Sequence, residues 1–291
     1  MPALLEALRP RQWSKNVFVL AGIVFAGRLF DPQAILRVLA AFGVFCAAAS
    51  AVYLANDVAD KDSDAHHPEK RTRPIASGRL TPALALAVSA ALTLLALSAA
   101  LSLNRAMLLI TGAYLASSFA YSFALKRVFL LDVMVVALGF VLRAAAGAAV
   151  IDAEISPWLL VCSFLLALFL ALGKRRSELL LLKDAAQSHR PALGHYSLQL
   201  LDSWLTALSG ATIVSYALYT QSQRTVEHFG TANLLYTVPF VIYALFRYQH
   251  LVLREEEGGD PGALLVRDKG LWLALLGWAV TAAFVIYRRT P

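Results

Sequence analysis

Long apolar runs alternate with short polar segments along the whole chain. Nine of these runs are long enough to cross the roughly 30 Å hydrocarbon core of a bilayer. Backbone groups inside a bilayer must bond to one another, and runs of this length can do so only as helices. The first run is short, so a count of eight stays open. The pattern predicts an all-α polytopic membrane protein with nine transmembrane helices, at residues 17–30, 34–57, 81–103, 106–125, 128–150, 156–173, 201–221, 232–252 and 271–287.

The composition agrees with the membrane as the solvent of this chain. Of the 291 residues, 59% are hydrophobic and only 15% are charged, and the mean hydropathy is +0.63, which is too apolar for an ordinary soluble domain of this length. The formal net charge of +7 is carried by lysines and arginines between the apolar runs. That distribution suits loops beside an anionic leaflet, so no nucleic-acid partner is expected.

The basic residues also predict the orientation. Most of the 26 lysines and arginines fall on the side of the membrane that holds the N-terminus, and the positive-inside rule makes that side cytoplasmic. The two longest polar segments, 58–80 and 174–200, lie on the same side. We therefore expect one catalytic domain over residues 1–291, with its active site between these cytoplasmic loops.

The strongest chemical signal is the acidic motif NDVADKDSD at residues 56–64. If the helix continues through it, Asn56, Asp60 and Asp64 lie on one face, because helical positions four apart are neighbours. Hard oxygen ligands with open positions suit Mg²⁺ that also holds substrate phosphates. The alternative is a solvated acidic helix end, but so many acids at a membrane boundary repel one another without a cation.

A basic cluster follows within the same loop, with Lys70, Arg71 and Arg73 a few residues after Asp64. Guanidinium and ammonium groups beside a carboxylate-bound metal can hold a diphosphate from its other side. A loop that only sets the topology also carries basic residues, but the pairing of opposite charges over so short a distance favours a binding role.

Further polar residues lie at the ends of the first, fourth and sixth predicted spans and within the fifth. Arg143 falls about three turns inside the fifth span and shares a helical face with Asp132, which marks it as a functional candidate or as half of a structural Asp–Arg pair. Lys15 and Lys126 sit at the same membrane boundary. Lys174 and Arg175 end the sixth span, where they can bind a lipid phosphate or anchor the helix.

At these residues the chain resembles the UbiA superfamily of intramembrane prenyltransferases over nearly its whole length. The NDxxDxxxD motif with nine spans carries the resemblance, and it implies a UbiA-type helical bundle and Mg²⁺ as the cofactor. Members usually have a second DxxxD motif. Here the matching stretch is Asp132-Val133-Met134-Val135-Val136, so valine replaces the second carboxylate.

The segments RPRQWSKN, YSFALK and DVMVVALGFVLRAAAG are similar to one branch of that superfamily. That resemblance implies transfer of 5-phosphoribose from 5-phosphoribosyl 1-diphosphate to decaprenyl phosphate or another polyprenyl phosphate, which supplies the cell-wall arabinan precursor. It also implies the bacterial inner membrane as the location. The oligomeric state, monomer or homo-oligomer, stays open.

A polyprenyl phosphate is already an anionic nucleophile, so the reaction needs a metal and cations for the leaving diphosphate rather than a general base. Asn56 and Asp60 are the predicted Mg²⁺ ligands. The predicted catalytic residues are Asp57 and Asp64, which support the metal, and Asp132, which with Tyr121 faces the ribose hydroxyls. The predicted substrate ligands are Lys15, Lys70, Arg71, Arg73, Tyr121, Lys126, Arg143, Lys174 and Arg175.

Three rivals remain at this point. The first is a UbiA-type prenyltransferase that joins a polyprenyl diphosphate to an aromatic acceptor, against which the missing second carboxylate argues. The second is a transporter, which also uses charges near the midplane. Against it, the polar residues gather on one side of the membrane and only Arg143 lies deep. The third is a structural lipid-binding scaffold, a class of protein that would not need the acidic motif.

Overall fold

The computed structural model describes residues 2–66, 70–154, 156–182, 191–254, 262, 264 and 267–287. Within these residues every regular element is a helix and there is no strand. The chain forms two compact units, Met1–Ile155 and Ser156–Pro291. The predicted all-α class is confirmed.

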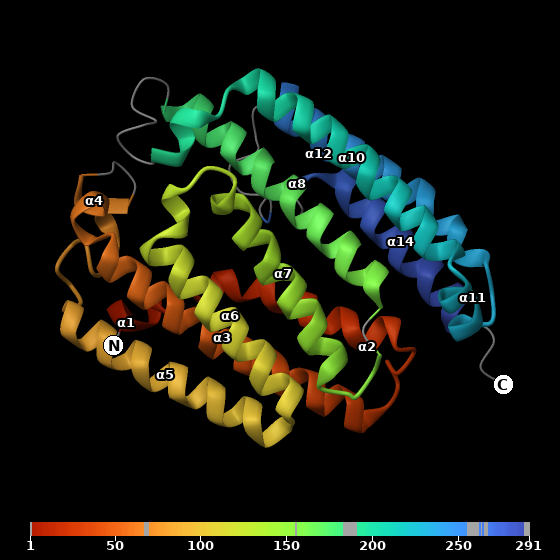
Figure 1. Cartoon of the computed structure of the whole chain (residues 1–291), viewed down its shortest axis with the longest axis horizontal. Helices are drawn as coiled ribbons and strands as arrows, with labels where there is room; N and C mark the ends of the chain where they lie inside the picture. The colour runs from red at the N-terminus through yellow and green to blue at the C-terminus, as the bar shows by residue number, and fades with distance from the viewer. Residues whose placement is uncertain are drawn as a thin grey trace. The chain divides into compact units, whose positions relative to one another are not determined.

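Unit 1 is built around one central helix, α3 (Pro32–Ala59), which packs against α5, α6, α7 and η1 (Figure 1). About two thirds of its most apolar stretch is buried, whereas α5 and α6 bury less than a third of theirs and expose leucines outward. This difference separates an inner helix from lipid-facing ones. The other elements of unit 1 are α1 (Pro2–Ala7), η1 (Pro10–Leu20), α2 (Ala21–Phe25), α4 (Lys61–Ala65), η2 (Lys70–Thr72), α5 (Pro82–Leu103), α6 (Arg105–Phe123), η3 (Leu125–Arg127) and α7 (Leu131–Ala149).

Polar side chains mark where the long helices begin. Asp31 accepts hydrogen bonds from the backbone N–H groups of Gln33 and Ala34 at the start of α3. Asn104 accepts one from Met107, 2.7 Å away, at the start of α6. Such caps satisfy N–H groups that have no partner within the helix.

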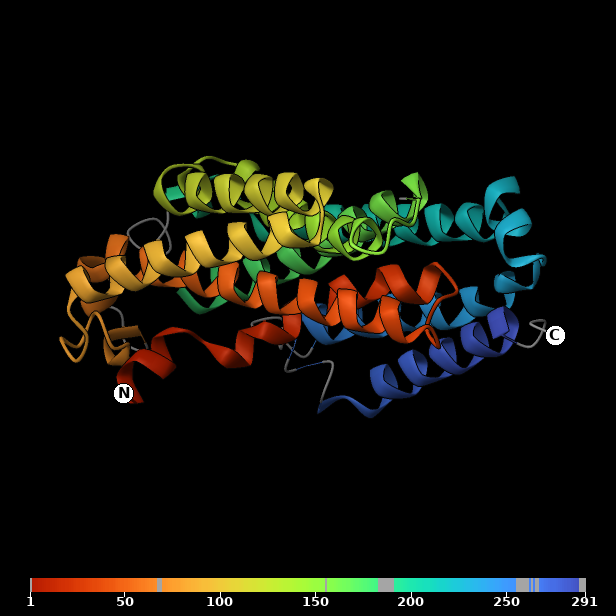
Figure 2. The same cartoon turned by 90° about the horizontal axis from the view of Figure 1, so that it is seen from below.

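Two glycines let α7 cross the N-terminal segment at backbone contact. A Cβ atom on Gly147 would lie 1.8 Å from the carbonyl oxygen of Val19, and one on Gly22 would lie 2.3 Å from the backbone of Gly147. Small residues at a crossing allow this approach. Figure 2 shows the N-terminal segment running beside α3, with which η1 is in contact.

The described part of unit 2 contains four long helices and three short ones. α8 packs against α10, and α12 packs against both α10 and α14. Its elements are α8 (Pro157–Leu182), η5 (Pro191–His195), α10 (Leu198–Gln221), α11 (Gln223–Phe229), η6 (Asn233–Thr237), α12 (Val238–Arg254) and α14 (Lys269–Tyr287).

The predicted count of nine spans is not confirmed. Six helices in the described residues are long and apolar enough to cross a membrane, or seven if the bent pair of α11 with η6–α12 counts as one. The predicted first span, 17–30, is instead the end of η1 followed by the five-residue helix α2 and a turn at Gly27, whose φ is +66°. α10 is long, but it carries several polar residues and is not among the helices apolar enough to cross a membrane.

The predicted loop 174–200 is also partly wrong. α8 continues to Leu182, so Lys174 and Arg175 lie on a helix, more than a turn before its end. No proline or glycine follows Arg175 closely enough to stop the helix, and apolar residues continue to its last turn. Residues 183–190 lie outside the described residues.

Candidate active site

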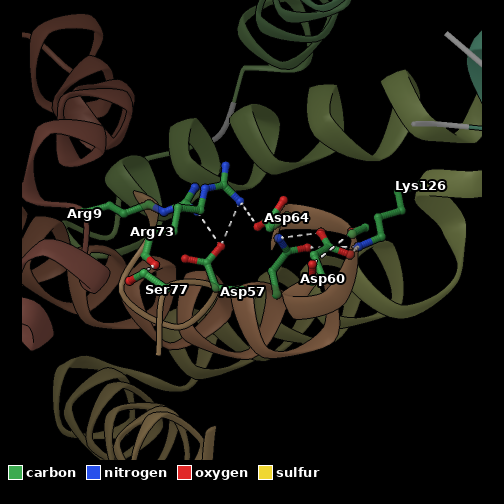
Figure 3. A network of polar contacts seen from close by, with 9 residues as sticks. Arg9, Asp57, Asp60, Asp64, Arg73, Ser77 and Lys126 are labelled. Carbon is green, nitrogen blue, oxygen red and sulfur yellow. Dashed lines mark hydrogen bonds and ion pairs between the residues drawn. The ribbon is translucent and has the colours of Figure 1, made fainter. Parts of the chain in front are cut away.

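The acidic motif does not lie on one continuous helix. α3 ends at Ala59, Asp60 has φ −98° and ψ 6°, and the short helix α4 begins at Lys61. Asn56 and Asp60 share one partner, as expected for one face, whereas Asp64 pairs with Arg73 instead. The carboxylates divide into two groups that point to different partners (Figure 3).

The first group is an oxygen pair that converges on a cation. The Lys126 ammonium donates to Asp60 Oδ1 at 2.5 Å and to Asn56 Oδ1 at 3.3 Å. Asn56 Nδ2 donates to the other Asp60 oxygen at 3.1 Å. Lys126 reaches the pair from η3, the turn between α6 and α7, so residues 70 positions apart meet here.

The second group joins Asp57 and Asp64 through one guanidinium. Arg73 donates to Asp64 Oδ2 at 2.5 Å and to Asp57 Oδ1 at 3.2 Å. Both carboxylates are almost fully buried. Ser77 donates to the Arg73 carbonyl at 2.7 Å and fixes the turn that carries the guanidinium.

Arg9 belongs to the second group, although the sequence did not single it out. Its guanidinium forms an ion pair with Asp57 and lies 5.1 Å from the centre of the Tyr53 ring. In the sequence it reads as one of several basic residues ahead of the first apolar run. Its only distinguishing signal there is the proline that follows, which constrains its backbone.

The donor set of the first group fits a divalent metal. One carboxylate and one amide oxygen already converge on a positive charge, and Mg²⁺ is commonly held by one or two protein oxygens together with substrate phosphates. In the described part of the chain, no three Asp, Glu, His or Cys side chains gather as a closed metal cage. A metal held by this pair would have most of its coordination positions open for other oxygen ligands.

Arg143 lies deeper in unit 1 with other partners. Its guanidinium donates to Asn16 Oδ1 at 2.8 Å and to the Tyr114 hydroxyl at 2.9 Å, and it packs on the rings of Tyr114 and Phe140. An intramembrane arginine is tolerated where polar groups surround it. These contacts join α7, α6 and η1.

The remaining predicted residues of unit 1 differ in burial. Asp132 is fully buried in the first turn of α7. Tyr121 is half-buried near the end of α6, Lys70 is half-buried on η2, and Lys15 and Arg71 are exposed. The structure thus brings Asn56, Asp60 and Lys126 into one contact group and Asp57, Asp64 and Arg73 into a second. The hydrogen bonds of Arg143 described above lead to neither group.

In unit 2 the basic run on α8 is tied to neighbouring side chains. Arg175 donates to Glu178 at 2.6 Å. Arg176 donates to Asp202 on α10 and to the Val252 carbonyl on α12, which joins three helices. Lys174 is exposed on the same turn.

Known proteins resemble this chain over nearly its full length. The model of the UbiA prenyltransferase family matches residues 16–264. A protein of Corynebacterium glutamicum named decaprenyl-phosphate phosphoribosyltransferase is 37% identical over 98% of this chain and 86% of its own. A protein of the same name from Mycolicibacterium smegmatis is 33% identical over 98% and 92%.

Solved structures agree on the fold. A UbiA homologue from Archaeoglobus fulgidus, bound to DMAPP and Mg²⁺, matches with a TM-score of 0.73 at 19% identity, over 98% of this chain and 99% of the other. A homologue from Aeropyrum pernix matches with a TM-score of 0.59 over 96% and 98%. The family inferred from the acidic motif is confirmed, and the chain belongs to the UbiA prenyltransferase family, a family of multi-pass membrane transferases.

Proposed function

We propose that this protein transfers 5-phosphoribose from 5-phosphoribosyl 1-diphosphate to a polyprenyl phosphate, such as decaprenyl phosphate, and releases diphosphate. The observation that carries the proposal is the charged site of unit 1. There the Asn56 and Asp60 oxygens share the Lys126 ammonium, and the guanidinium groups of Arg9 and Arg73 hold the neighbouring carboxylate of Asp57. The names of the relatives from Corynebacterium and Mycolicibacterium support the same reaction.

In this reaction an oxygen of the lipid phosphate forms a bond to the anomeric carbon of the ribose, and the bond from that carbon to the diphosphate breaks. The electron pair leaves with the diphosphate, so the chain must stabilise negative charge. When bound, Mg²⁺ supplies part of that stabilisation by holding the diphosphate oxygens. Asn56 and Asp60 are its proposed protein ligands.

Lys126 has two proposed partners in turn. Its ammonium balances Asp60 before the metal binds, and it is then free to donate to the incoming diphosphate. The metal and the released ammonium together carry more positive charge than Asp60 neutralises, and the incoming diphosphate balances the excess. Arg73, Lys70 and Arg71 are proposed to bind the diphosphate and the 5-phosphate, with help from Lys15.

Asp57 and Asp64 are proposed to support the metal site through Arg73 and water. Tyr121 and Asp132 are the proposed ligands of the ribose hydroxyls, and Arg143 stays a predicted phosphate ligand whose described contacts also serve packing. Lys174 and Arg175 stay the predicted ligands of the lipid phosphate.

We place the protein in the bacterial inner membrane with its N-terminus and this site on the cytoplasmic side. The basic loops around the acidic network support this orientation. A soluble diphosphate sugar is made in the cytoplasm, so a cytoplasmic site also gives access to the proposed donor.

The experiment that tests the function is incubation of the detergent-purified protein with Mg²⁺, 5-phosphoribosyl 1-diphosphate and a polyprenyl phosphate. We expect mass spectrometry of the lipid fraction to show a phosphoribosylated lipid that disappears with EDTA. Absence of this product, with prenylation of an aromatic acid by a polyprenyl diphosphate instead, would replace the proposal with the aromatic prenyltransferase.

A further inference from the structure

The N-terminal segment is tied to α3 on both sides of Arg9. The Ser50 hydroxyl donates to the Leu8 carbonyl at 2.9 Å and accepts from the Trp13 indole N–H at 3.0 Å. Ser50 is buried on α3, seven residues before Asp57. One serine therefore fixes the turn that contains Arg9.

Arg9 has a backbone conformation that non-glycine residues rarely adopt. Its φ is 54° and its ψ is 58°, in the left-handed region, directly before Pro10. Such a conformation persists only where the surroundings enforce it, and it concentrates at functional sites. Here the two hydrogen bonds at Ser50 hold the turn from both ends.

This turn directs the guanidinium to one face of α3. Ser50, Tyr53 and Asp57 lie at positions i, i+3 and i+7, which form one helical face. The Arg9 guanidinium covers the Tyr53 ring and pairs with Asp57. Asp57 is 2% exposed, and its Oδ1 also accepts from Arg73, so guanidinium groups from two separate segments hold one carboxylate oxygen.

We propose that Arg9 is a positioning residue that holds Asp57 against Arg73 and keeps this carboxylate out of the metal's ligand set. Asp57 directly follows Asn56. A carboxylate that has lost one of its two guanidinium partners competes better for a metal than the neutral amide beside it. With Arg9 in place, the metal keeps Asn56 and Asp60 as ligands and leaves positions open for phosphate. The inference rests on the metal assignment of the proposed function.

Mn²⁺ binding without substrate tests the inference, because Mn²⁺ takes the same oxygen ligands. Electron paramagnetic resonance of free Mn²⁺ gives the dissociation constant for the detergent-purified wild type, Arg9→Met, Asp57→Asn and the double variant. We expect Arg9→Met to bind Mn²⁺ at least about threefold tighter than wild type, since Asp57 joins the ligands. In the Asp57→Asn background, the same change at Arg9 is expected to shift the constant by less than about 1.5-fold.

Arg11→Met is the matched control. Arg11 is an exposed arginine two residues further along the same segment, and its loss removes the same charge without touching Asp57. We expect it to leave Mn²⁺ binding at the wild-type level. Arg9→Lys keeps the charge but not the planar guanidinium, and we expect an intermediate shift. It also provides a second variant if Arg9→Met does not fold.

Equal shifts on removal of Arg9 with and without Asp57 would overturn the inference, because Arg9 would then act only through its long-range charge. No shift in either Arg9 variant would overturn it as well. If the wild type itself binds no Mn²⁺, both the metal assignment and this inference fail. If the wild type binds Mn²⁺ but the effects of Arg9→Met and Asp57→Asn on binding simply add, the inference fails and the proposed function still stands.

Discussion

At the scale of single residues, the candidate site is a set of charges that already neutralise one another. Asp60 pairs with Lys126, and Asp57 and Asp64 pair with Arg9 and Arg73. Buried charges need such partners, because an unpaired ion in this environment is strongly destabilising. Replacing one residue of an ion pair should therefore change the activity and also leave the charge of its partner unbalanced.

Asp60→Ala is expected to reduce phosphoribosyl transfer by at least about a hundredfold, because the metal loses its carboxylate ligand. The measurement is the initial rate with Mg²⁺ and both substrates, next to the melting temperature of the variant. Asp62→Ala is the matched control, since Asp62 belongs to the same motif but is exposed on α4. A near-normal rate in Asp60→Ala would remove Asp60 from the metal site.

Lys126→Met is expected to strengthen metal binding and to weaken substrate binding. Without the ammonium at Asp60 and Asn56, Mn²⁺ alone should bind at least about threefold tighter, whereas the Michaelis constant for 5-phosphoribosyl 1-diphosphate should rise. Arg127→Met, on the same turn and exposed, should change neither value. Weaker Mn²⁺ binding in Lys126→Met would contradict competition between the ammonium and the metal.

The residue types of the site could be predicted from sequence, but their grouping could not. The spacing in NDxxDxxxD identified the acids, and the short distance to Arg73 identified its partner. Arg9 was missed because its role comes from a left-handed turn and from a hydrogen bond between Ser50 and the carbonyl of the neighbouring Leu8, 42 positions apart. No local pattern encodes such a contact.

At the scale of elements, the break at Asp60 decides how the motif works. A helical repeat predicts one face for Asn56, Asp60 and Asp64, and that would be right if α3 continued. The motif instead spans the end of α3 and the start of α4. Asp57 and Asp64, one on each helix, share Arg73, whereas Asp60 at the junction pairs with Lys126. Long apolar runs predicted the helices well, whereas their ends depend on these tertiary contacts.

Gly147→Ala is expected to destabilise the protein by on the order of 3 kcal/mol, because the new Cβ overlaps the Val19 carbonyl and α7 must move away from η1. Thermal unfolding in detergent measures the loss. The control is Gly43→Ala on α3, where nothing lies within 4 Å of the added atom and stability should be unchanged or slightly higher. Equal melting temperatures for both variants would contradict the close crossing.

Asp268 links α14 to α12 and should make unit 2 sensitive to acid. Hydrogen bonds from Arg247, and from backbone N–H groups at the start of α14, hold the pKa of Asp268 below its usual value of 3.8. A lowered carboxyl pKa gives stability that is present above the unfolded value and is lost as the pH falls through the folded value.

We therefore expect the melting temperature of wild type to fall more between pH 6 and pH 3 than that of Asp268→Asn, which lacks this titration. At pH 6 the variant should melt at a lower temperature than wild type. Asp62→Asn, a change on the exposed surface of α4, should retain the acid dependence. Parallel curves for wild type and Asp268→Asn would show that this pair does not contribute.

At the scale of the whole molecule, the hydrophobic pattern predicted the fold class but not the number of spans. The six helices that meet the criteria for length and apolarity lie inside the predicted runs or overlap them. The first run failed because it begins in the tight turns of η1 and ends at Gly27, so it never forms a long helix. Hydropathy measures how apolar a segment is and does not report such turns.

The topology can be tested with single cysteines on either side of α5. Ser63→Cys on α4 should react with a membrane-impermeant maleimide only in inside-out vesicles, and Ser102→Cys at the far end of α5 only in right-side-out vesicles. Both serines are exposed. Wild type, with Cys46 buried and Cys162 partly covered, gives the background. The reverse pattern would invert the proposed orientation, and labelling from one side would contradict α5 as a span.

The turn held by Ser50 also affects how the protein should be produced for study. A short stretch ahead of the first apolar run is usually the first choice for an affinity tag or a trimmed end. Here a deletion through Arg9 would remove the Arg9–Asp57 pair, the Leu8–Ser50 bond and the exposed Glu6–Arg79 pair together. A preparation shortened in this way could fold its long helices and still be inactive, so purification handles belong at the other end of the chain.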